Sequence, residues 1–151
     1  MKKILLLFVA LIVGLFVCAQ KPPQKVIDNF NRKFKNAPKV KWTREDENEW
    51  EAEFRKDGEE MSASYNDVGK WKSTGIKISK KELPDIVRIT VAEEYRGWII
   101  EEVESCVGPK FRGYELRLEK GKEEVKILVT KYGKIKVNKE PKEKKVDTDE
   151  K

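Results

Sequence analysis

Apolar and polar residues alternate along this chain with two different periods. Val26, Phe30 and Phe34 recur every four residues, which predicts an amphipathic helix that opens after Pro22 and Pro23. Further along, residues 50–54 alternate between apolar and acidic side chains, which is the period of a half-buried strand. The same reasoning predicts strands at residues 40–42, 50–55, 61–65 and 70–78, with turns at Asp57-Gly58 and Gly69 between them.

This pattern of helix and strands occurs twice. Residues 50–54, 61–65 and 67–71 reappear as residues 114–118, 125–129 and 131–135, each 64 positions later. Ser79 and Glu82 have the spacing of a capping box and lead into the second copy. The second copy predicts a helix over residues 84–95 and strands over residues 99–106, 111–119, 123–130 and 134–137.

The repeat predicts an α+β fold. Each unit is one helix followed by about four antiparallel strands, and the two repeats cover residues 22–78 and 79–137 of a single domain, residues 20–137. One face of such a sheet is apolar and must be covered, and the amphipathic helix of each unit is the natural cover. A unit of about 55 residues is marginally stable alone. We therefore expect the units to pool their cores in one continuous sheet, with the helices on one face and the other face bare.

The N-terminus predicts export. Lys2 and Lys3 precede an apolar run over residues 4–17, which has the length and charge of a signal peptide and is short for a membrane span. We expect residues 1–19 to be cleaved after Ala19, which leaves no transmembrane segment. A competing interpretation makes Cys18 the lipidated first residue of a lipoprotein. At the other end, residues 138–151 are almost entirely charged and predict a disordered tail.

The amino-acid composition limits the classes of partner that we expect. The chain has 33 basic and 27 acidic residues, a formal net charge of +6, and the two signs alternate finely. A nucleic-acid-binding protein would concentrate positive charge on one face, so we expect no nucleic-acid partner. Cys106 alone would remain after cleavage, which excludes an internal disulfide, and its apolar neighbours predict a half-buried structural residue.

The chemistry-bearing residue types are mostly missing. Without histidine, the Ser-His-Asp and Cys-His arrangements and the usual zinc sites are excluded, and no glycine-rich phosphate loop occurs. Glu51 and Glu53 share a strand face, but the second copy has Glu115 and Arg117 there, so we interpret them as surface charges rather than a catalytic pair. We expect no catalytic residue, no metal site and no cofactor.

The bare face of the sheet remains as the candidate binding surface. Residues that alternate with the apolar rows would face outward there, and Trp71 begins a strand after a turn, where it could be half exposed. The candidate partner-binding residues are Lys41, Glu51, Glu53, Ser62, Ser64, Trp71, Glu115, Arg117 and Lys126.

The order of these segments resembles a known family. Residues 36–42, 50–54, 58–65, 69–71 and 82–84 together resemble the PepSY-like family of secreted bacterial proteins described as beta-lactamase-inhibitor-like. The resemblance covers about residues 22–137, and it implies a tandem α+β domain, an extracytoplasmic location and protein or peptide binding. The second copy departs most, since Gly108-Pro109 lies in a loop and Ile135 replaces the turn tryptophan.

These observations predict a secreted, periplasmic, non-catalytic binding module. It would hold a protein or peptide through the open sheet face, in an inhibitor-like way, because complementary charge gives specificity and faster association. The alternative is a structural or envelope-associated protein without a discrete ligand.

Overall fold

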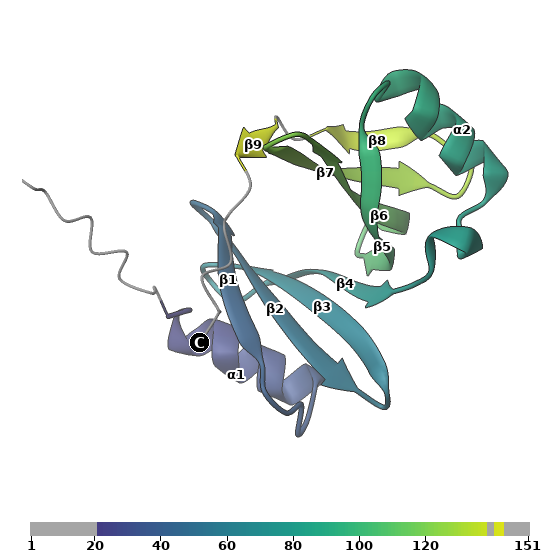
Figure 1. Ribbon diagram of the computed structural model, residues 1–151. Helices are drawn as coiled ribbons and strands as arrows, with labels where there is room; N and C mark the ends of the chain where they lie inside the picture. Colours follow the sequence, from purple (N-terminus) through teal and green to yellow (C-terminus); the bar gives the residue numbers. More distant parts are fainter. Residues whose placement is uncertain (1–20, 139–140, 144–151) are drawn as a thin grey trace, which may run out of the picture.

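The computed structural model describes residues 21–138 and 141–143 (Figure 1). The first unit consists of α1 (Gln24–Lys33), β1 (Lys41–Asp46), β2 (Glu49–Lys56), β3 (Glu59–Asn66) and β4 (Trp71–Lys77). The second consists of η1 (Lys80–Glu82), α2 (Asp85–Glu94), β5 (Ile99–Gly108), β6 (Phe111–Lys120), β7 (Glu123–Thr130), β8 (Ile135–Asn138) and β9 (Lys142–Glu143). The two predicted units are confirmed, and the strands of the second begin and end within about two residues of the predicted positions.

All described strands belong to one antiparallel sheet. Their order follows the chain from β1 to β8, and β9 pairs with β7. The two units meet where β4 pairs with β5, from Thr74 opposite Val107 to Lys77 opposite Glu104. Figure 1 shows that the sheet curls, so that its two halves face each other while α1 and α2 lie on the outside. The predicted fold class, one continuous sheet with both helices on one face, is therefore confirmed.

Each unit has a core of its own, which corrects the expectation of a pooled core. In the first, Phe30 of α1 meets Phe54 edge-on at a centroid distance of 5.0 Å and packs with the buried Trp50. In the second, Val87 and Val91 of α2 pack on strands β5 to β7. Because the sheet curls, each helix covers only the half of the sheet that follows it. Among the described residues the two clusters share no member.

Two repeated glycines explain why the turns after β3 and β7 look alike in the sequence. Gly69 and Gly133 have φ angles of +80° and +81°, in the left-handed region. A β-carbon would lie 2.6 Å from Asn29 Nδ2 at Gly69, and 2.7 Å from Thr90 Oγ1 at Gly133. Each turn therefore passes directly against the helix of its own unit, and only glycine leaves room for that approach.

The capping box and the C-terminal segment differ in detail from the prediction. Ser79 and Glu82 do form a capping box, but it closes the short η1, and α2 begins separately after Pro84. Most of the predicted tail lies outside the described residues, and so does the whole of the predicted signal peptide, residues 1–19. Within the tail, Lys142 pairs with β7 through β9, and its Nζ donates to the carbonyl oxygen of Glu45 at 3.0 Å.

Candidate functional site

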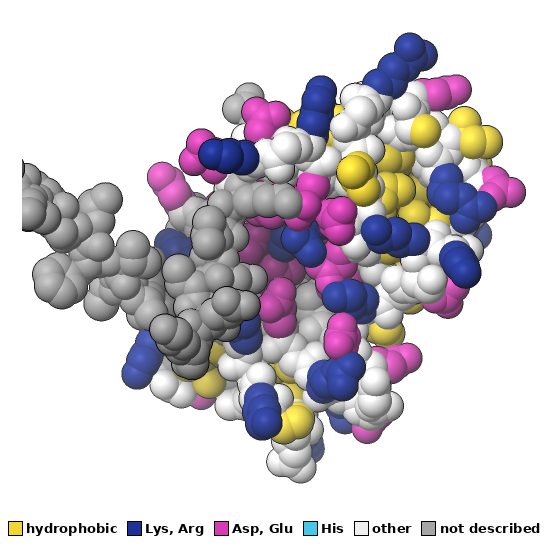
Figure 2. Space-filling model, viewed as in Figure 1, with side chains coloured by type: hydrophobic (Ala, Val, Ile, Leu, Met, Phe, Trp, Pro, Cys, Tyr) yellow, Lys and Arg dark blue, Asp and Glu magenta, His cyan; other side chains and the backbone are white. Residues whose placement is uncertain are grey.

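The helix-free face of the curled sheet forms a hollow between the two halves. Directly opposed residues of antiparallel strands share a face, so Glu51 lies on the same side as Ser64, and Glu53 on the same side as Lys41 and Ser62. In the second unit Arg117 is opposite Lys126. We call this surface the hollow; it carries Lys41, Glu45, Glu51, Glu53, Ser62, Ser64, Glu102, Glu104, Cys106, Glu115, Arg117, Lys126 and Leu128. Figure 2 shows carboxylates gathered in it around basic side chains.

The hollow is less open than the sequence predicts. Glu51, Ser62 and Ser64 are only 6%, 6% and 7% exposed, whereas Lys41 and Glu53 are exposed as expected. The reason is the curl of the sheet, which brings β7 across from β2 and covers the centre of the face. The expectation that Glu51 is a solvated surface charge is wrong.

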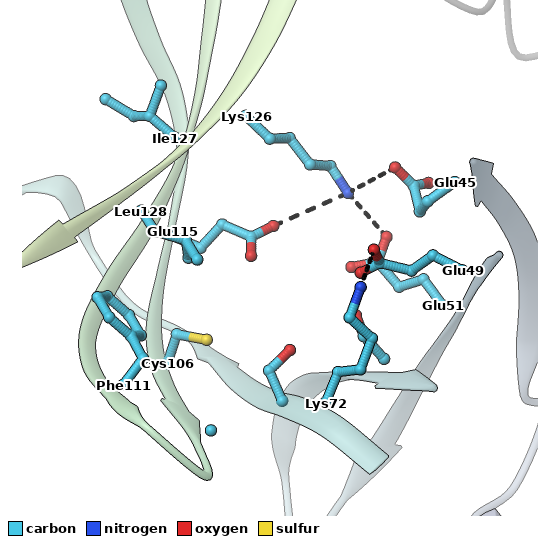
Figure 3. Close-up of a pocket in the computed structure, with 13 residues that line it drawn as sticks. Glu45, Glu49, Glu51, Lys72, Cys106, Phe111, Glu115, Lys126, Ile127 and Leu128 are labelled. Carbon is cyan, nitrogen blue, oxygen red and sulfur yellow. Dashed lines mark hydrogen bonds and ion pairs between the residues drawn. The ribbon is translucent and has the colours of Figure 1, made fainter. Parts of the chain in front are cut away.

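Lys126 connects the two halves at the centre of the hollow. Its Nζ lies 2.7 Å from Glu51 Oε2, 3.3 Å from Glu45 Oε2 and 4.0 Å from Glu115 Oε1 (Figure 3). The amine comes from β7, and the carboxylates come from β2, β1 and β6. One half-buried cation thus holds three carboxylates, two of them from the other unit.

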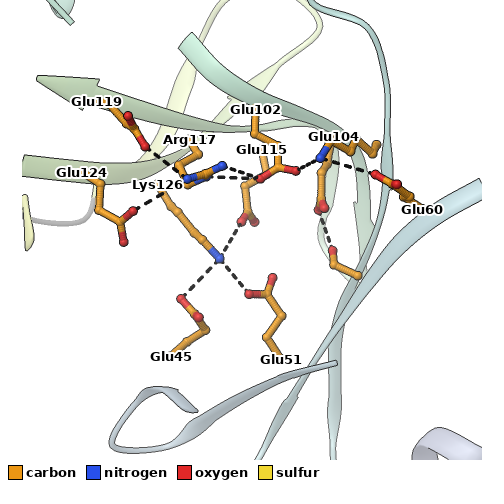
Figure 4. Close-up of polar contacts among 12 residues, drawn as sticks. Glu45, Glu51, Glu60, Glu102, Glu104, Glu115, Arg117, Glu119, Glu124 and Lys126 are labelled. Carbon is orange, nitrogen blue, oxygen red and sulfur yellow. Dashed lines mark hydrogen bonds and ion pairs between the residues drawn. The ribbon is translucent and has the colours of Figure 1, made fainter. Parts of the chain in front are cut away.

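A second network runs along the edge of the hollow (Figure 4). Arg117 lies 3.0 Å from Glu102 and 3.2 Å from Glu119, and Lys77 pairs with the same Glu102 and with Glu60 at 3.4 Å. Because Lys77 is on β4, this network crosses the junction between the units. The network holds the charged side chains at the edge of the hollow in fixed positions around Lys126.

Burial changes the protonation of two carboxyls here. Desolvation raises the pKa of Glu51 to about 8; Lys126 lowers it, while Glu45 and Glu115 raise it. Desolvation likewise raises the pKa of Glu104 to about 7, although this carboxylate accepts a hydrogen bond from the Ser62 hydroxyl at 2.5 Å. These carboxyls can therefore hold protons near neutral pH.

Lys126 itself stays charged. Burial works against its charged form, but the neighbouring Glu51, Glu45 and Glu115 raise the pKa of this amine above its usual value. The shifts of Glu51 and Lys126 both point upward, which an isolated ion pair would not give. Burial, followed by the charges of Glu45 and Glu115, raises the pKa of Glu51, whereas the three neighbouring carboxylates raise the pKa of Lys126.

Three cavities open in the hollow: a wide one of about 610 Å³ at its edge, beside Glu53, Glu102 and Glu104, and two adjoining ones around Lys126. The larger of the two around Lys126, which we call the central cavity, has a volume of about 210 Å³. Figure 3 shows Glu45, Glu49, Glu51 and Lys72 on one side of it and Phe111, Cys106 and Leu128 on the other. The smaller, about 30 Å³, lies among Glu51, Glu53, Glu102, Glu104, Glu115, Arg117 and Lys126. Seven glutamates and three basic residues line the two cavities together, so the hollow is acidic although the chain is basic.

The cysteine in the central cavity is not set up as a nucleophile. Cys106 is 2% exposed, and desolvation, together with Glu115 and Glu104, raises the pKa of its thiol to about 12. The thiolate is the reactive form, and it is strongly disfavoured here. Cys106 therefore acts as a small buried side chain, more deeply buried than the sequence predicts.

Trp71 does not belong to the hollow, which corrects its inclusion among the candidate residues. The register between β3 and β4 shifts between Ser64 and Tyr65, so that Trp71 pairs with Tyr65 and packs against the first core. Lys33 of α1 lies 4.0 Å from the centre of its ring. Trp71 is thus on the helix side of the sheet, because the irregularity reverses the face that simple alternation assigns.

Several residues of the site, among them Glu45, Glu104 and Phe111, were missed by sequence reasoning. Glu45 belongs to β1, which extends beyond the strand predicted over residues 40–42, and Phe111 opens β6 at the rim of the central cavity. Glu104 could have been found, because it alternates with the buried Val103 along β5. No signal in the sequence showed that these residues would meet the β2 glutamates.

A metal-binding cluster and a membrane-spanning helix are both missing from the described part of the chain. Residues 21–138 and 141–143 contain no group of three or more His, Cys, Asp or Glu side chains that could hold a metal ion. No helix in these ranges is long and apolar enough to cross a membrane.

Comparison with known proteins identifies the fold. The sequence matches no protein-family model and no curated protein. Among solved structures, a BLIP-like protein (beta-lactamase-inhibitor-like) of Bacteroides fragilis superposes with a TM-score of 0.53 at 21% identity, over 85% of this chain and 92% of that chain. The chain has the BLIP-like fold.

Two further structures agree with this result. A DUF2874 family protein of Bacteroides uniformis gives a TM-score of 0.57 at 21% identity, over 79% of this chain and 89% of that chain. A protein of Bacteroides eggerthii described as a candidate periplasmic protein gives 0.58 at 17% identity, over 80% and 89%. The resemblance stated from the sequence is confirmed at the level of fold, since identities this low establish no shared activity.

Proposed function

We propose that this protein is a periplasmic, non-catalytic binding module that holds a segment of a protein or peptide in the hollow. The observation that carries the proposal is the central cavity, a space of about 210 Å³ on the only large sheet face that the described helices leave uncovered. A curled sheet with charges on its concave side presents a shaped, electrostatically distinctive surface, which favours specific association.

Several further features support binding rather than catalysis. The chain has no histidine, and the buried thiol of Cys106 is held in its protonated form. Glu51 and Glu104 have raised pKa values, as catalytic carboxyls often do. In this hollow, however, both are engaged with neighbours, Glu51 with Lys126 and Glu104 with Ser62. Export, expected from the N-terminal sequence, agrees with the description of the Bacteroides eggerthii relative.

Site-specific photo-crosslinking tests the proposal. A photo-reactive phenylalanine analogue at Glu53, which is exposed in the hollow, should form a crosslink to a discrete partner in cells that export the protein. The same analogue at Ile89 is the matched control, because this side chain is 53% exposed on α2, outside the sheet. A crosslink from position 89 with none from position 53 contradicts the assignment of the face. The absence of a crosslink from both positions favours the structural or envelope-associated alternative.

A further inference from the structure

We propose that the central cavity takes a basic side chain of the partner, an arginine or a lysine, whose apolar stem lies against Phe111 and Leu128 and whose charged tip is held among the carboxylates of the hollow. This inference rests on the proposed function and adds the chemistry of the guest. The surface is the hollow on the helix-free face of the sheet, and the occupant is a cationic segment of a partner protein.

Charge complementarity is the first argument. The chain as a whole is basic, with a formal net charge of +6, yet glutamates outnumber basic residues seven to three around the two cavities. Figure 2 shows acidic side chains gathered in the hollow, while further acidic and basic side chains alternate over the rest of the visible face. A concave surface with a surplus of one charge sign concentrates the electrostatic field and attracts a guest of the opposite sign.

The position of Lys126 excludes the opposite choice. An anionic guest would have to use Lys126 or Lys72, the basic residues that line the central cavity, and Lys72 already pairs with Glu49. Lys126 already contacts Glu51, Glu45 and Glu115 within 4.0 Å. An anion would add a fourth negative charge to that group and would displace a carboxylate from its cation. A cation instead relieves the repulsion among the carboxylates.

The two walls of the central cavity fit an amphipathic side chain. One wall carries Glu45, Glu49 and Glu51, and the facing wall carries Phe111 and Leu128 (Figure 3). Lysine and arginine side chains have an apolar stem and a charged tip, and arginine also packs on aromatic rings. A cavity of about 150 Å³ accepts benzene, which has as many heavy atoms as an arginine side chain beyond its β-carbon. At about 210 Å³ the central cavity has room for such a group.

Binding of a cation should also change the protonation of Glu51. The Glu51 carboxyl faces Glu45 on β1, Glu115 on β6 and Lys126 on β7, with Lys72 of β4 on the same side of the cavity. When a guest cation arrives, the protonated form of this carboxyl loses its proton to the solvent, and the carboxylate pairs with the guest. Binding should therefore release protons and strengthen as the pH rises from 6 to 8.5.

The probe that tests this inference is n-butylguanidinium, an arginine side chain without its backbone. The processed full-length protein, labelled at its methyl groups, is titrated and observed by NMR. We expect chemical shift changes at Leu128, which lines the cavity, and none at Val68 and Ile89, which are exposed elsewhere. n-Butylurea has nearly the same shape without the charge and should bind at least about tenfold more weakly, because hydrogen bonds to charged groups are the stronger ones.

Three variants test whether the probe binds in the central cavity rather than through general electrostatic attraction to the protein. Glu115→Gln should weaken n-butylguanidinium binding at least about tenfold, and Phe111→Ala should weaken it several-fold without changing its pH dependence. Glu60→Gln is the matched control and should leave binding unchanged, because Glu60 lies outside the central cavity. The readout in each case is the dissociation constant from the NMR titration, after a spectrum of the free variant has shown that it is folded.

The outcomes distinguish this inference from the proposed function. If n-butylurea binds as well as n-butylguanidinium, or if no shift occurs at Leu128 up to 50 mM probe, the cation site is wrong. A crosslink from position 53 would in that case still support partner binding in the hollow. If affinity falls rather than rises between pH 6 and 8.5, the coupling to the carboxyls is also wrong.

Discussion

Replacing Lys126 with methionine tests whether this amine holds the two halves of the sheet together. The substitution keeps the apolar stem and removes the charge that lies 2.7, 3.3 and 4.0 Å from three carboxylates. At an effective dielectric constant of about 20, even a 4 Å pair contributes about 4 kcal/mol of attraction. The cost of burying each ion, several kcal/mol, offsets much of this sum. Removing one partner of a buried group of this kind costs about 3–5 kcal/mol, because the other charges lose their compensation.

The assay is urea unfolding followed by tryptophan fluorescence at pH 8. Arg55→Met is the matched control, since Arg55 and Glu60 also lie 2.7 Å apart but have side chains that are 69% and 47% exposed. An exposed pair contributes little, so this control should move the midpoint hardly at all. Both cations lie 2.7 Å from a carboxylate, but Lys126 is less exposed than Arg55 and contacts two further carboxylates.

The pH dependence of the decrease in unfolding free energy caused by Lys126→Met gives a second check. The pKa of Glu51 is raised in the folded protein, so the folded state binds more protons than the unfolded state between pH 4.5 and 8. Without Lys126 that pKa rises further, and keeping Glu51 protonated becomes more costly as the pH increases. The loss from Lys126→Met should thus be larger at pH 8 than at pH 5.5. An equal loss at both values, or a loss no larger than that of Arg55→Met, would refute this account of the hollow.

Further predictions concern pH, packing, turns and export. Unfolding free energy of the wild type should fall as the pH rises from 5 to 8, by up to about 1.4 kcal/mol per pH unit for each titrating carboxyl, as measured by urea unfolding in a series of buffers. Trp50→Ala should cost about 3–5 kcal/mol in the same assay, because the side chain is 1% exposed. In thermal unfolding, Gly69→Ala should be more destabilising than Gly58→Ala, since both have positive φ but only the Gly69 site lacks space for a β-carbon. The intact mass of the exported protein should correspond to a chain that begins at Gln20. A mass that corresponds to a chain beginning at Cys18 and carrying acyl groups would instead establish lipidation.

Much of the architecture was readable before any contact was known. The alternation over residues 50–54 placed Trp50 and Phe54 in the core and Glu51 on the opposite face, and the structure has them there. The recurrence of the pattern 64 positions later gave the second unit and its antiparallel strands. Period and turn glycines suffice for this because they act locally: they fix how a strand presents its side chains and where it reverses.

The tertiary structure decided what lies across from each face. Alternation assigns Glu51 and Lys126 to the same side of the sheet, but they are 75 residues apart, and only the accumulated twist and the β4–β5 pairing bring them to 2.7 Å. The same curl separated the cores and buried Ser62 and Ser64. One irregularity in register was enough to put Trp71 on the helix side. Curvature is a sum over many strands, so no local pattern in the sequence specifies it, and the acidic hollow exists only because of it.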